Sequence, residues 1–151
     1  MSEITIKKAE QCHVPQIAEI ERNCIPRPWS EAAFAAALED EKAVTLAAFC
    51  GDVLCGFITG IYLLDTADIY SVAVSAEYRE KGVGKRLLEE FFSALPEDVN
   101  SVGLEVRESN IPAIKLYEKT GFERVGLRKN FYQDPRENAV LMTKKLPCPI
   151  E

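Results

Sequence analysis

The sequence contains almost no histidine and has no cysteine pattern that would hold a metal. Its 151 residues include one histidine, His13, and five cysteines, none of them in a C-x-x-C pair. Zinc sites need clustered Cys and His ligands, and an odd number of cysteines cannot all pair within one chain. Both observations argue against a zinc site and against a disulfide framework. We therefore expect reduced thiols that are buried as small apolar residues, at Cys12, Cys24, Cys50, Cys55 and Cys148.

Long apolar runs are also missing. No apolar segment of the chain reaches the roughly 18 residues that a membrane-spanning helix needs. The first residues lack the basic stretch followed by an apolar stretch that is typical of a secretory signal. From these two absences we expect a cytoplasmic protein that has no membrane partner.

A positive net charge is missing as well. The chain has 24 acidic and 18 basic residues, which give a formal net charge of −6. Because phosphate contacts dominate affinity for nucleic acids, we expect no direct nucleic-acid partner. An acidic protein can host a cationic substrate, but many acidic proteins bind none, so the charge decides little about the substrate.

What the chain does contain is a single series of strands and helices. With 47% hydrophobic and 28% charged residues, its length suits one domain around one core. Apolar periodicity predicts strands at residues 4–6, 44–50, 53–64, 69–74, 99–107, 122–127 and 139–144. It predicts helices at 12–22, 31–39 and 82–95, and one more between Asn110 and Gly121. The order is typical of an α/β or α+β domain with a mixed central sheet flanked by helices, which we assign to residues 1–146, with a tail at 147–151.

Local signals set several boundaries. Pro26 and Pro28 end the first helix, Ser30 is the expected N-cap of the second, and the sequence Gly-Asp at 51–52 fits a tight hairpin turn. The polar and aromatic segment 128–138 is expected to form a loop. The third helix has one apolar stripe, made by Val83, Leu87, Leu88, Phe91 and Leu95.

Residues 79–85 (Arg-Glu-Lys-Gly-Val-Gly-Lys) lie between a β-branched strand and this amphipathic helix. Two glycines let backbone N–H groups approach a ligand closely, and a helix start adds unpaired donors and the positive end of its dipole. These features predict a site for a pyrophosphate or a similar anion. The alternative is a plain strand-to-helix turn with a solvated basic helix face. Four positive charges fall within eight residues, at Arg79, Lys81, Lys85 and Arg86.

Two other phosphate motifs do not fit this stretch. The chain has no G-x-x-x-x-G-K-[ST], so it is not a P-loop nucleotidase, and no third glycine stands at the spacing of a dinucleotide-binding turn.

The pattern [RQ]-x-x-G-x-[GA] after a strand and before a helix resembles the signature of the GCN5-related N-acetyltransferases, and the order of elements resembles that family across nearly the whole chain. The resemblance implies acetyl-coenzyme A as co-substrate and requires no metal. It implies that backbone amides hold the coenzyme pyrophosphate, at Arg79, Glu80, Lys81, Gly82, Val83, Gly84 and Lys85. It also implies that the preceding strand hydrogen-bonds the pantetheine arm, through Val72, Ala73 and Val74.

Residues 104–122 read Leu-Glu-Val-Arg-Glu-Ser-Asn-Ile-Pro-Ala-Ile-Lys-Leu-Tyr-Glu-Lys-Thr-Gly-Phe. They resemble the L-E-V-R-x-S-N-x-x-A-I-x-L-Y-x-K-x-G-F segment of bacterial enzymes that acetylate the N-terminal alanine of a small-subunit ribosomal protein. Segments 22–30 and 128–139 resemble the early and late substrate loops of that group, with two departures: Phe131 stands where tyrosine is common, and Asn138 where aspartate is common. The resemblance implies a protein N-terminus as acceptor, that of a ribosomal protein.

Glu105 is the candidate general base. An amine attacks a thioester as the free base, and a protein N-terminus with a pKa of about 8 is only partly neutral at pH 7, so a carboxylate must take up the remaining proton. Glu105 lies mid-strand between Leu104 and Val106, so it points to the opposite face from both, and burial there would favour proton uptake. The alternative is a strand carboxylate paired with a cation such as Arg107. The resemblance implies the role of base.

Tyr117 is the candidate general acid, since a phenol can protonate the departing thiolate. The alternative is a tyrosine whose ring packs in the core and whose hydroxyl bonds a backbone carbonyl. The resemblance implies the role of acid, and for Asn110 a coenzyme contact besides helix capping. Trp29 and Tyr132 are candidate walls of the acceptor site, or alternatively aromatic anchors of surface loops.

The leading hypothesis is acetylation of a protein N-terminus by direct transfer in a ternary complex, which needs no nucleophile on the enzyme. One alternative is an acetyltransferase for a small-molecule amine, which would keep Glu105 and Tyr117 but close the acceptor site. Another is a non-catalytic sensor that binds coenzyme A, which would need neither residue.

Overall fold

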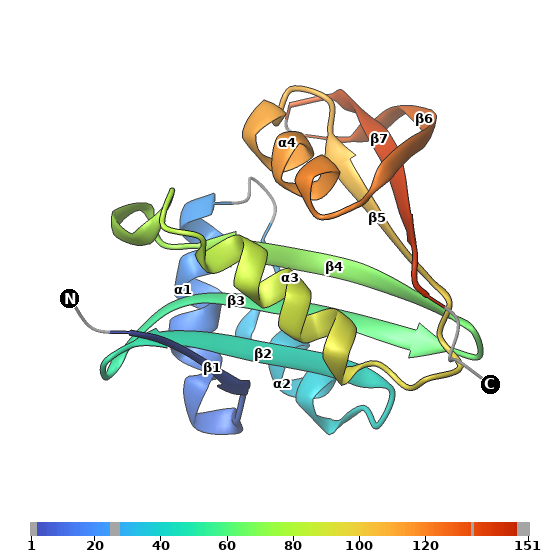
Figure 1. Ribbon diagram of the computed structural model, residues 1–151. Helices are drawn as coiled ribbons and strands as arrows, with labels where there is room; N and C mark the ends of the chain where they lie inside the picture. Colours follow the sequence, from blue (N-terminus) through green and yellow to red (C-terminus); the bar gives the residue numbers. More distant parts are fainter. Residues whose placement is uncertain (1–2, 25–27, 134, 148–151) are drawn as a thin grey trace.

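The computed structural model describes residues 3–24, 28–133 and 135–147, so Pro26, Arg27 and Cys148 lie outside the described residues. Figure 1 shows the fold, whose elements follow the predicted order. The strands are β1 (Ile4–Lys8), β2 (Ala43–Cys50), β3 (Val53–Leu63), β4 (Thr66–Val74), β5 (Ser101–Arg107), β6 (Glu123–Tyr132) and β7 (Glu137–Lys145). The α-helices are α1 (Val14–Cys24), α2 (Glu31–Glu39), α3 (Val83–Ala94) and α4 (Ile111–Lys119), and two short 3-10 turns are η1 (Gln11–His13) and η2 (Ala76–Tyr78).

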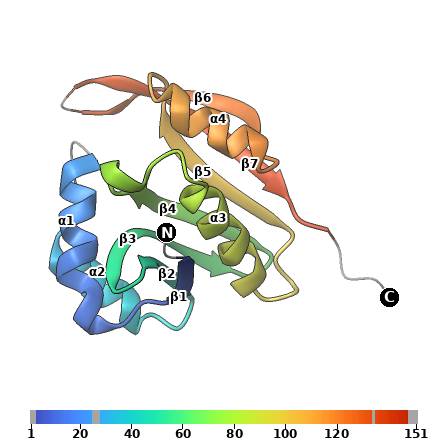
Figure 2. The ribbon, with the colours of Figure 1, turned by 60° about the vertical axis from the view of Figure 1, so that its left-hand side comes forward.

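All seven strands form one mixed sheet in the order β1-β2-β3-β4-β5-β7-β6, which confirms the predicted fold class. Every neighbouring pair is antiparallel except β4 and β5, which run parallel. The β4–β5 ladder has only three residue pairs, from Thr66–Ser101 to Asp68–Gly103. Beyond Asp68 and Gly103 the two strands diverge, as Figures 1 and 2 show, and we call this divergence the fork.

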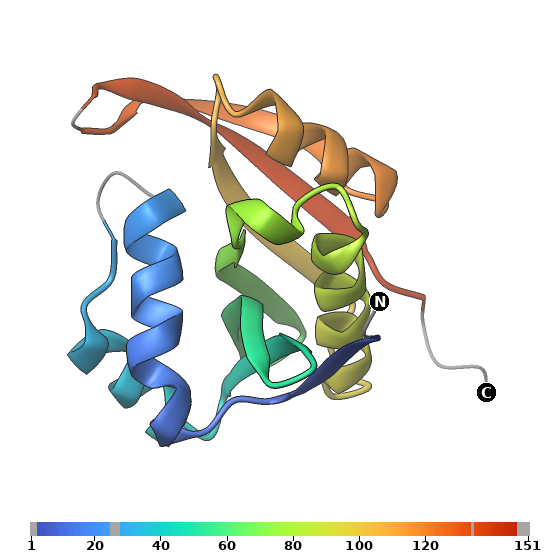
Figure 3. The ribbon, with the colours of Figure 1, turned by 90° about the vertical axis from the view of Figure 1, so that its left-hand side faces the viewer.

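Helices cover both faces of the sheet (Figure 3). On one face α3 and α4 pack into a core cluster that includes Leu88, Phe91 and Ile114, and on the other α1 and α2 pack with Phe57 and Phe34. The apolar stripe predicted for α3 is buried at every position. Burying such side chains stabilises the fold by about 1.5–3 kcal/mol each.

The predicted caps are present. The Ser30 hydroxyl accepts a hydrogen bond from the Ala33 N–H at 3.1 Å, and the Asn110 carboxamide oxygen accepts one from the Ala113 N–H at 3.3 Å. Gly121, with φ of 103°, follows α4 in a conformation that favours glycine.

Two predictions are wrong. Residues 128–132 continue β6 instead of forming a loop; since β6 lies at the sheet edge with nearly every side chain exposed, its sequence shows no alternation of apolar and polar residues. The expected burial of the thiols holds only for Cys55 among the four described cysteines, since Cys12 is exposed and Cys24 and Cys50 are half-buried. Within the described ranges, none of the helices has the length and apolar character that a membrane span requires.

Candidate active site

The edge of β4 at the fork offers backbone groups to a ligand. After Asp68 no strand pairs with the side of β4 that faces β5 among the described residues. An extended ligand can bind such an edge as an added strand would. Val72, Ala73 and Val74 lie on this stretch, although the Val74 carbonyl already accepts a hydrogen bond from Arg79 Nε at 3.0 Å.

The turn that follows converges on the start of α3. Glu80 and Gly82 have left-handed φ angles of 63° and 82°, and Gly82 is the N-cap of α3 without a side-chain cap. Consecutive N–H groups of such turns point toward one place and bind anions, and the first helical N–H groups lack intrahelical partners. A Cβ on Gly82 would meet nothing within 4 Å, so the space beside this backbone is open.

Two of the four basic side chains near this turn, those of Arg79 and Arg86, bond to other elements of the fold. Arg79 turns back to α1, where its Nη2 lies 3.1 Å from Cys24 Sγ. Arg86 donates to the Ile4 carbonyl on β1, and the Lys81 ammonium lies 5.7 Å from the centre of the Tyr78 ring. The backbone of residues 79–85 is therefore the element suited to hold a pyrophosphate.

Helix α4 comes close to this turn. A Cβ on Gly84 would lie 3.0 Å from Leu116 Cδ2, so glycine at this position allows the start of α3 to approach α4. Leu116 precedes Tyr117, so the helix that carries the candidate acid contacts the start of α3.

Tyr117 is buried, with its ring against Phe122 at a centroid distance of 5.7 Å. No hydrogen bond of its hydroxyl occurs among the described residues, and in that part of the chain no fully buried side-chain oxygen lacks a partner. The hydroxyl oxygen is therefore not completely buried and does not bond a backbone carbonyl. Burial, with a smaller contribution from Tyr132, raises the pKa of Tyr117, so the phenol keeps its proton at neutral pH.

Glu105 points away from the core, as predicted from its place between Leu104 and Val106, which are both buried. Its side chain is 38% exposed, so the expected burial is absent. Its ion-pair partner is Arg128 of β6, whose Nη1 lies 3.4 Å from Glu105 Oε2, and not Arg107. The edge strand supplies this partner, and only strand pairing could reveal it.

Tyr132 interacts electrostatically with both candidate catalytic residues. Burial raises its pKa to about 12, and the nearby Glu105 carboxylate adds to the rise. Tyr132 in turn contributes to the raised pKa of Tyr117, so Tyr132 lies within electrostatic range of both Glu105 and Tyr117. The Arg107 guanidinium lies 4.5 Å from the centre of the Tyr132 ring.

Trp29 is held on the other side of the fork, next to β4. Its ring packs against Phe34 and Tyr70, at centroid distances of 5.2 and 5.5 Å. Its backbone N–H donates to Glu21 Oε2 at 2.8 Å, and Glu21 Oε1 accepts a hydrogen bond from the Ser71 hydroxyl on β4. Glu21 is only 2% exposed.

Sequence analysis missed two polar residues here. For Glu21 a signal existed, because this charged residue falls on the apolar face of its helix. No sequence signal pointed to Asp68. Its Oδ1 would lie 3.2 Å from a Cβ on Gly103, so this glycine, two residues before Glu105 on β5, leaves room for the Asp68 carboxylate. That proximity exists only because β4 and β5 pair in parallel.

The two departures from the family pattern have partners in the structure. Asn138 accepts a hydrogen bond from the Asn130 N–H at 2.9 Å and donates one to Glu108 Oε1 at 3.2 Å, which an aspartate could not do. The Phe131 ring lies 5.2 Å from the Arg128 guanidinium, and it packs on Tyr132 at 5.1 Å.

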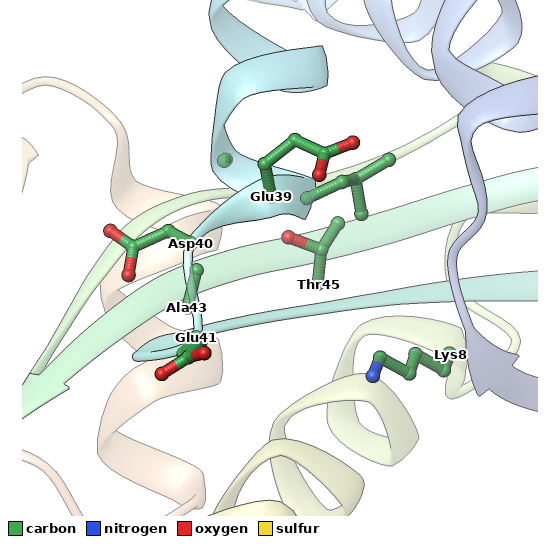
Figure 4. Close-up of a pocket in the computed structure, with 8 residues that line it drawn as sticks. Lys8, Glu39, Asp40, Glu41, Ala43 and Thr45 are labelled. Atoms are coloured by element: carbon green, nitrogen blue, oxygen red, sulfur yellow. The ribbon is translucent and has the colours of Figure 1, made fainter.

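A hollow of about 210 Å³ lies elsewhere, at the C-terminal end of α2 (Figure 4). It is lined by residues of β1, of β2 and of the end of α2 with the turn after it, among them Lys8, Glu39 and Thr45. None of its lining residues belongs to β4, β5 or α4, so we assign it no part in the candidate site. Within the described part of the chain, no group of three His, Cys, Asp or Glu side chains could hold a metal ion.

The arrangement suits transfer between two ligands that meet at the fork. Backbone amides and an open strand edge can hold an elongated anion, a neutral phenol can donate a proton, and a carboxylate can accept one. Tyr117 comes from the α4 face and Glu105 points to the opposite face, so the ligands can approach from different sides of the sheet.

Comparisons with known proteins agree with this geometry. Residues 14–122 match the acetyltransferase (GNAT) family. The [ribosomal protein bS18]-alanine N-acetyltransferase of Escherichia coli K12 is 34% identical over 141 residues, which cover 91% of this chain and 95% of the relative. The crystal structure of the ribosomal-protein-S18-alanine N-acetyltransferase from Escherichia coli superposes with a TM-score of 0.88 at 33% identity, covering 99% of this chain and 97% of that one. Arabidopsis thaliana NAA60 in complex with acetyl-CoA has a TM-score of 0.86 at 21% identity, covering 95% and 99% of the two chains, and shows the shared fold alone.

Proposed function

The chain belongs to the acetyltransferase (GNAT) family, and from that premise we propose that it transfers the acetyl group of acetyl-CoA to the N-terminal amine of a protein. The observation that carries the proposal is the accessible Tyr117 hydroxyl on one face of the fork, with Glu105 directed to the other. Both lie within electrostatic range of Tyr132. A protein that only bound coenzyme A would need neither group.

Acetyl-CoA binds, in this proposal, along the fork. The open edge of β4 pairs with the pantetheine arm at Val72–Val74, and the amides of residues 79–85 receive the pyrophosphate. Asn110 uses its oxygen to cap α4. Its amide NH₂ group stays available for a coenzyme contact.

The chemistry needs two proton transfers and no covalent enzyme intermediate. The acceptor nitrogen attacks the thioester carbonyl carbon, and Glu105 takes up the proton that the nitrogen loses, directly or through one water. As the tetrahedral intermediate collapses, the C–S bond breaks and the Tyr117 hydroxyl protonates the thiolate. Burial keeps Tyr117 protonated at neutral pH, so its proton is present when the thiolate forms.

The acceptor we propose is a small-subunit ribosomal protein that begins with alanine. Support comes from the E. coli relative, named for ribosomal protein bS18, which matches nearly the whole chain. The aromatic side chains of Trp29 and Tyr132 form walls on either side of Glu105 in this proposal. A ribosomal acceptor also places the reaction in the cytoplasm.

The test is release of coenzyme A thiol from acetyl-CoA with three acceptors. These are a short peptide beginning with a free alanine, the same peptide with a blocked N-terminus, and spermidine. Turnover with the free peptide alone is the expected result. Turnover with spermidine alone would assign a small-molecule amine as substrate, and tight acetyl-CoA binding without any turnover would favour a sensor.

A further inference from the structure

The outer end of the β6–β7 hairpin is not held by a regular strand ladder. Pairing of β6 with β7 shifts register once between Arg124 and Gly126, continues to Arg128–Ala139 and resumes only at Tyr132–Glu137. Between these pairs three residues of β6, 129–131, face only Asn138, and Asn130 has a left-handed φ of 52°. Such a bulge disrupts the main-chain hydrogen bonds of the ladder. The position of Tyr132 therefore depends on other contacts.

Arg107, the last residue of β5, supplies these contacts. Its Nη1 donates to the Pro135 carbonyl at 2.9 Å and to Glu137 Oε1 at 3.3 Å, and its Nη2 donates to the Gln133 carbonyl at 3.0 Å. Its guanidinium also lies over the Tyr132 ring, and its side chain is 15% exposed. A planar guanidinium can form all these contacts at once, whereas the single ammonium of a lysine cannot.

The residues after Arg107 complete the attachment. The Ser109 N–H donates to Glu137 Oε2 at 2.6 Å, and the Glu108 N–H donates to the Asn138 carbonyl at 3.0 Å. Segment 107–109 therefore holds the hairpin at several points.

The hairpin carries two residues that surround Glu105. Arg128 is its ion-pair partner, and Tyr132 is close enough for the Glu105 charge to raise its pKa. The anion-binding turn, in contrast, is attached to α1 and β1 through Arg79 and Arg86. A shift of the hairpin would change the surroundings of Glu105 and leave the turn in place.

We propose that Arg107 is a positioning residue that forms the acceptor side of the site in advance, by holding the β6–β7 hairpin so that Tyr132 stays against the Arg107 guanidinium and Arg128 stays paired with Glu105. Contacts that exist before binding spare the acceptor the cost of ordering them. This inference rests on the proposed function for its substrate. It assigns Arg107 to acceptor affinity, and not to coenzyme binding or to proton transfer.

The experiment compares Arg107→Lys and Arg107→Gln with a matched control, Arg124→Gln. Arg124 lies on the same hairpin, where its Nε is 3.5 Å from Glu118 Oε2 in an exposed pair. For both Arg107 variants we expect the KM for the peptide to rise about tenfold, with kcat and the KM for acetyl-CoA changed less than about twofold. Hydrogen exchange of amides 129–138 becomes about fivefold faster or more, because the contacts that restrain them are lost. The control matches the wild type in both measurements.

Two results would overturn the inference. One is an Arg107→Lys variant with wild-type peptide KM and wild-type exchange, since the guanidinium would then be unnecessary. The other is a uniform change, in which kcat and both KM values move together with the melting temperature, as a merely structural residue would cause. Hydrogen exchange needs no acceptor, so it tests whether Arg107 holds the hairpin even if the wild type acetylates no peptide. A wild-type enzyme that acetylates no peptide would refute the proposed function and not the role of Arg107 in holding the hairpin.

Discussion

The two sides of the fork are held in place by different means. On the coenzyme side, backbone conformation dominates: left-handed Glu80 and Gly82 aim amides at one place, and the buried stripe of α3 fixes the helix behind them. On the acceptor side, charged side chains dominate, through Arg107 with Glu137 and Arg128 with Glu105. A binding site formed by backbone groups keeps its ligand contacts when most side chains are substituted. A single substitution can displace a hairpin that is held by ion pairs. The coenzyme side is thus suited to one constant ligand and the acceptor side to specificity.

The largest effect is expected at the boundary between the two sides. Glu105→Gln and Tyr117→Phe should each lower kcat by about 10²–10³-fold, since each removes one proton transfer. Both variants keep the shape of the side chain, so affinity for acetyl-CoA should not change. Thiol release under saturating substrates and titration with acetyl-CoA measure the two quantities. Full turnover by Tyr117→Phe would remove this residue as the general acid.

A second substitution tests whether the α1 side depends on a buried charge. Glu21→Ala should lower the free energy of unfolding by about 2–4 kcal/mol, because it leaves the Trp29 N–H and the Ser71 hydroxyl without their partner and opens a cavity. Glu21→Gln, which keeps an acceptor and the volume, should recover most of this loss. Urea unfolding measures both variants. Equal stability of Glu21→Ala and wild type would mean that Glu21 does not tie α1 to β4.

A third substitution examines the backbone conformation on the coenzyme side. Gly82→Ala introduces a left-handed alanine into open space, at a cost of about 1–2 kcal/mol. The free turn relieves this strain by changing its backbone, and binding must restore the left-handed conformation, so the KM for acetyl-CoA should rise about fivefold or more, since 1.4 kcal/mol corresponds to a factor of ten. The peptide KM should not change. A rise in the peptide KM alone would contradict the division between the two sides.

The smallest effect concerns acid pH and the acceptor side. Hydrogen bonds from Ser109, with further help from Arg107, lower the pKa of Glu137. A carboxyl group whose pKa is lower when folded contributes stability above its unfolded pKa of about 4.3, and this contribution is lost as the pH falls through the folded pKa. The protection factors of the hairpin amides, which take account of the slower intrinsic exchange at acid pH, should therefore fall as the pH drops. In Glu137→Gln this fall should be absent; an unchanged pH dependence would exclude Glu137 as its cause.

Much of the local structure on the proposed coenzyme side could be predicted from the sequence because its signals are local. Glycine spacing, the apolar stripe of α3 and the N-cap of α4 each involve residues a few positions apart. The place of the four nearby basic side chains could not be predicted, since Arg79 and Arg86 find partners on α1 and β1. Even a short basic segment thus depends on distant elements for the direction of its side chains.

The sequence by itself determined the order of elements and the family, and it supplied the candidate residues for acetyl transfer. These follow from local periodicity, capping and a contiguous motif at 104–122. Only the tertiary structure decided that β6 continues to Tyr132, that Arg128 rather than Arg107 pairs with Glu105, and that Asp68 lies over Gly103. The reason is physical: these contacts arise from the pairing of strands far apart in the chain, and such pairing is set by how the whole sheet packs between its helices.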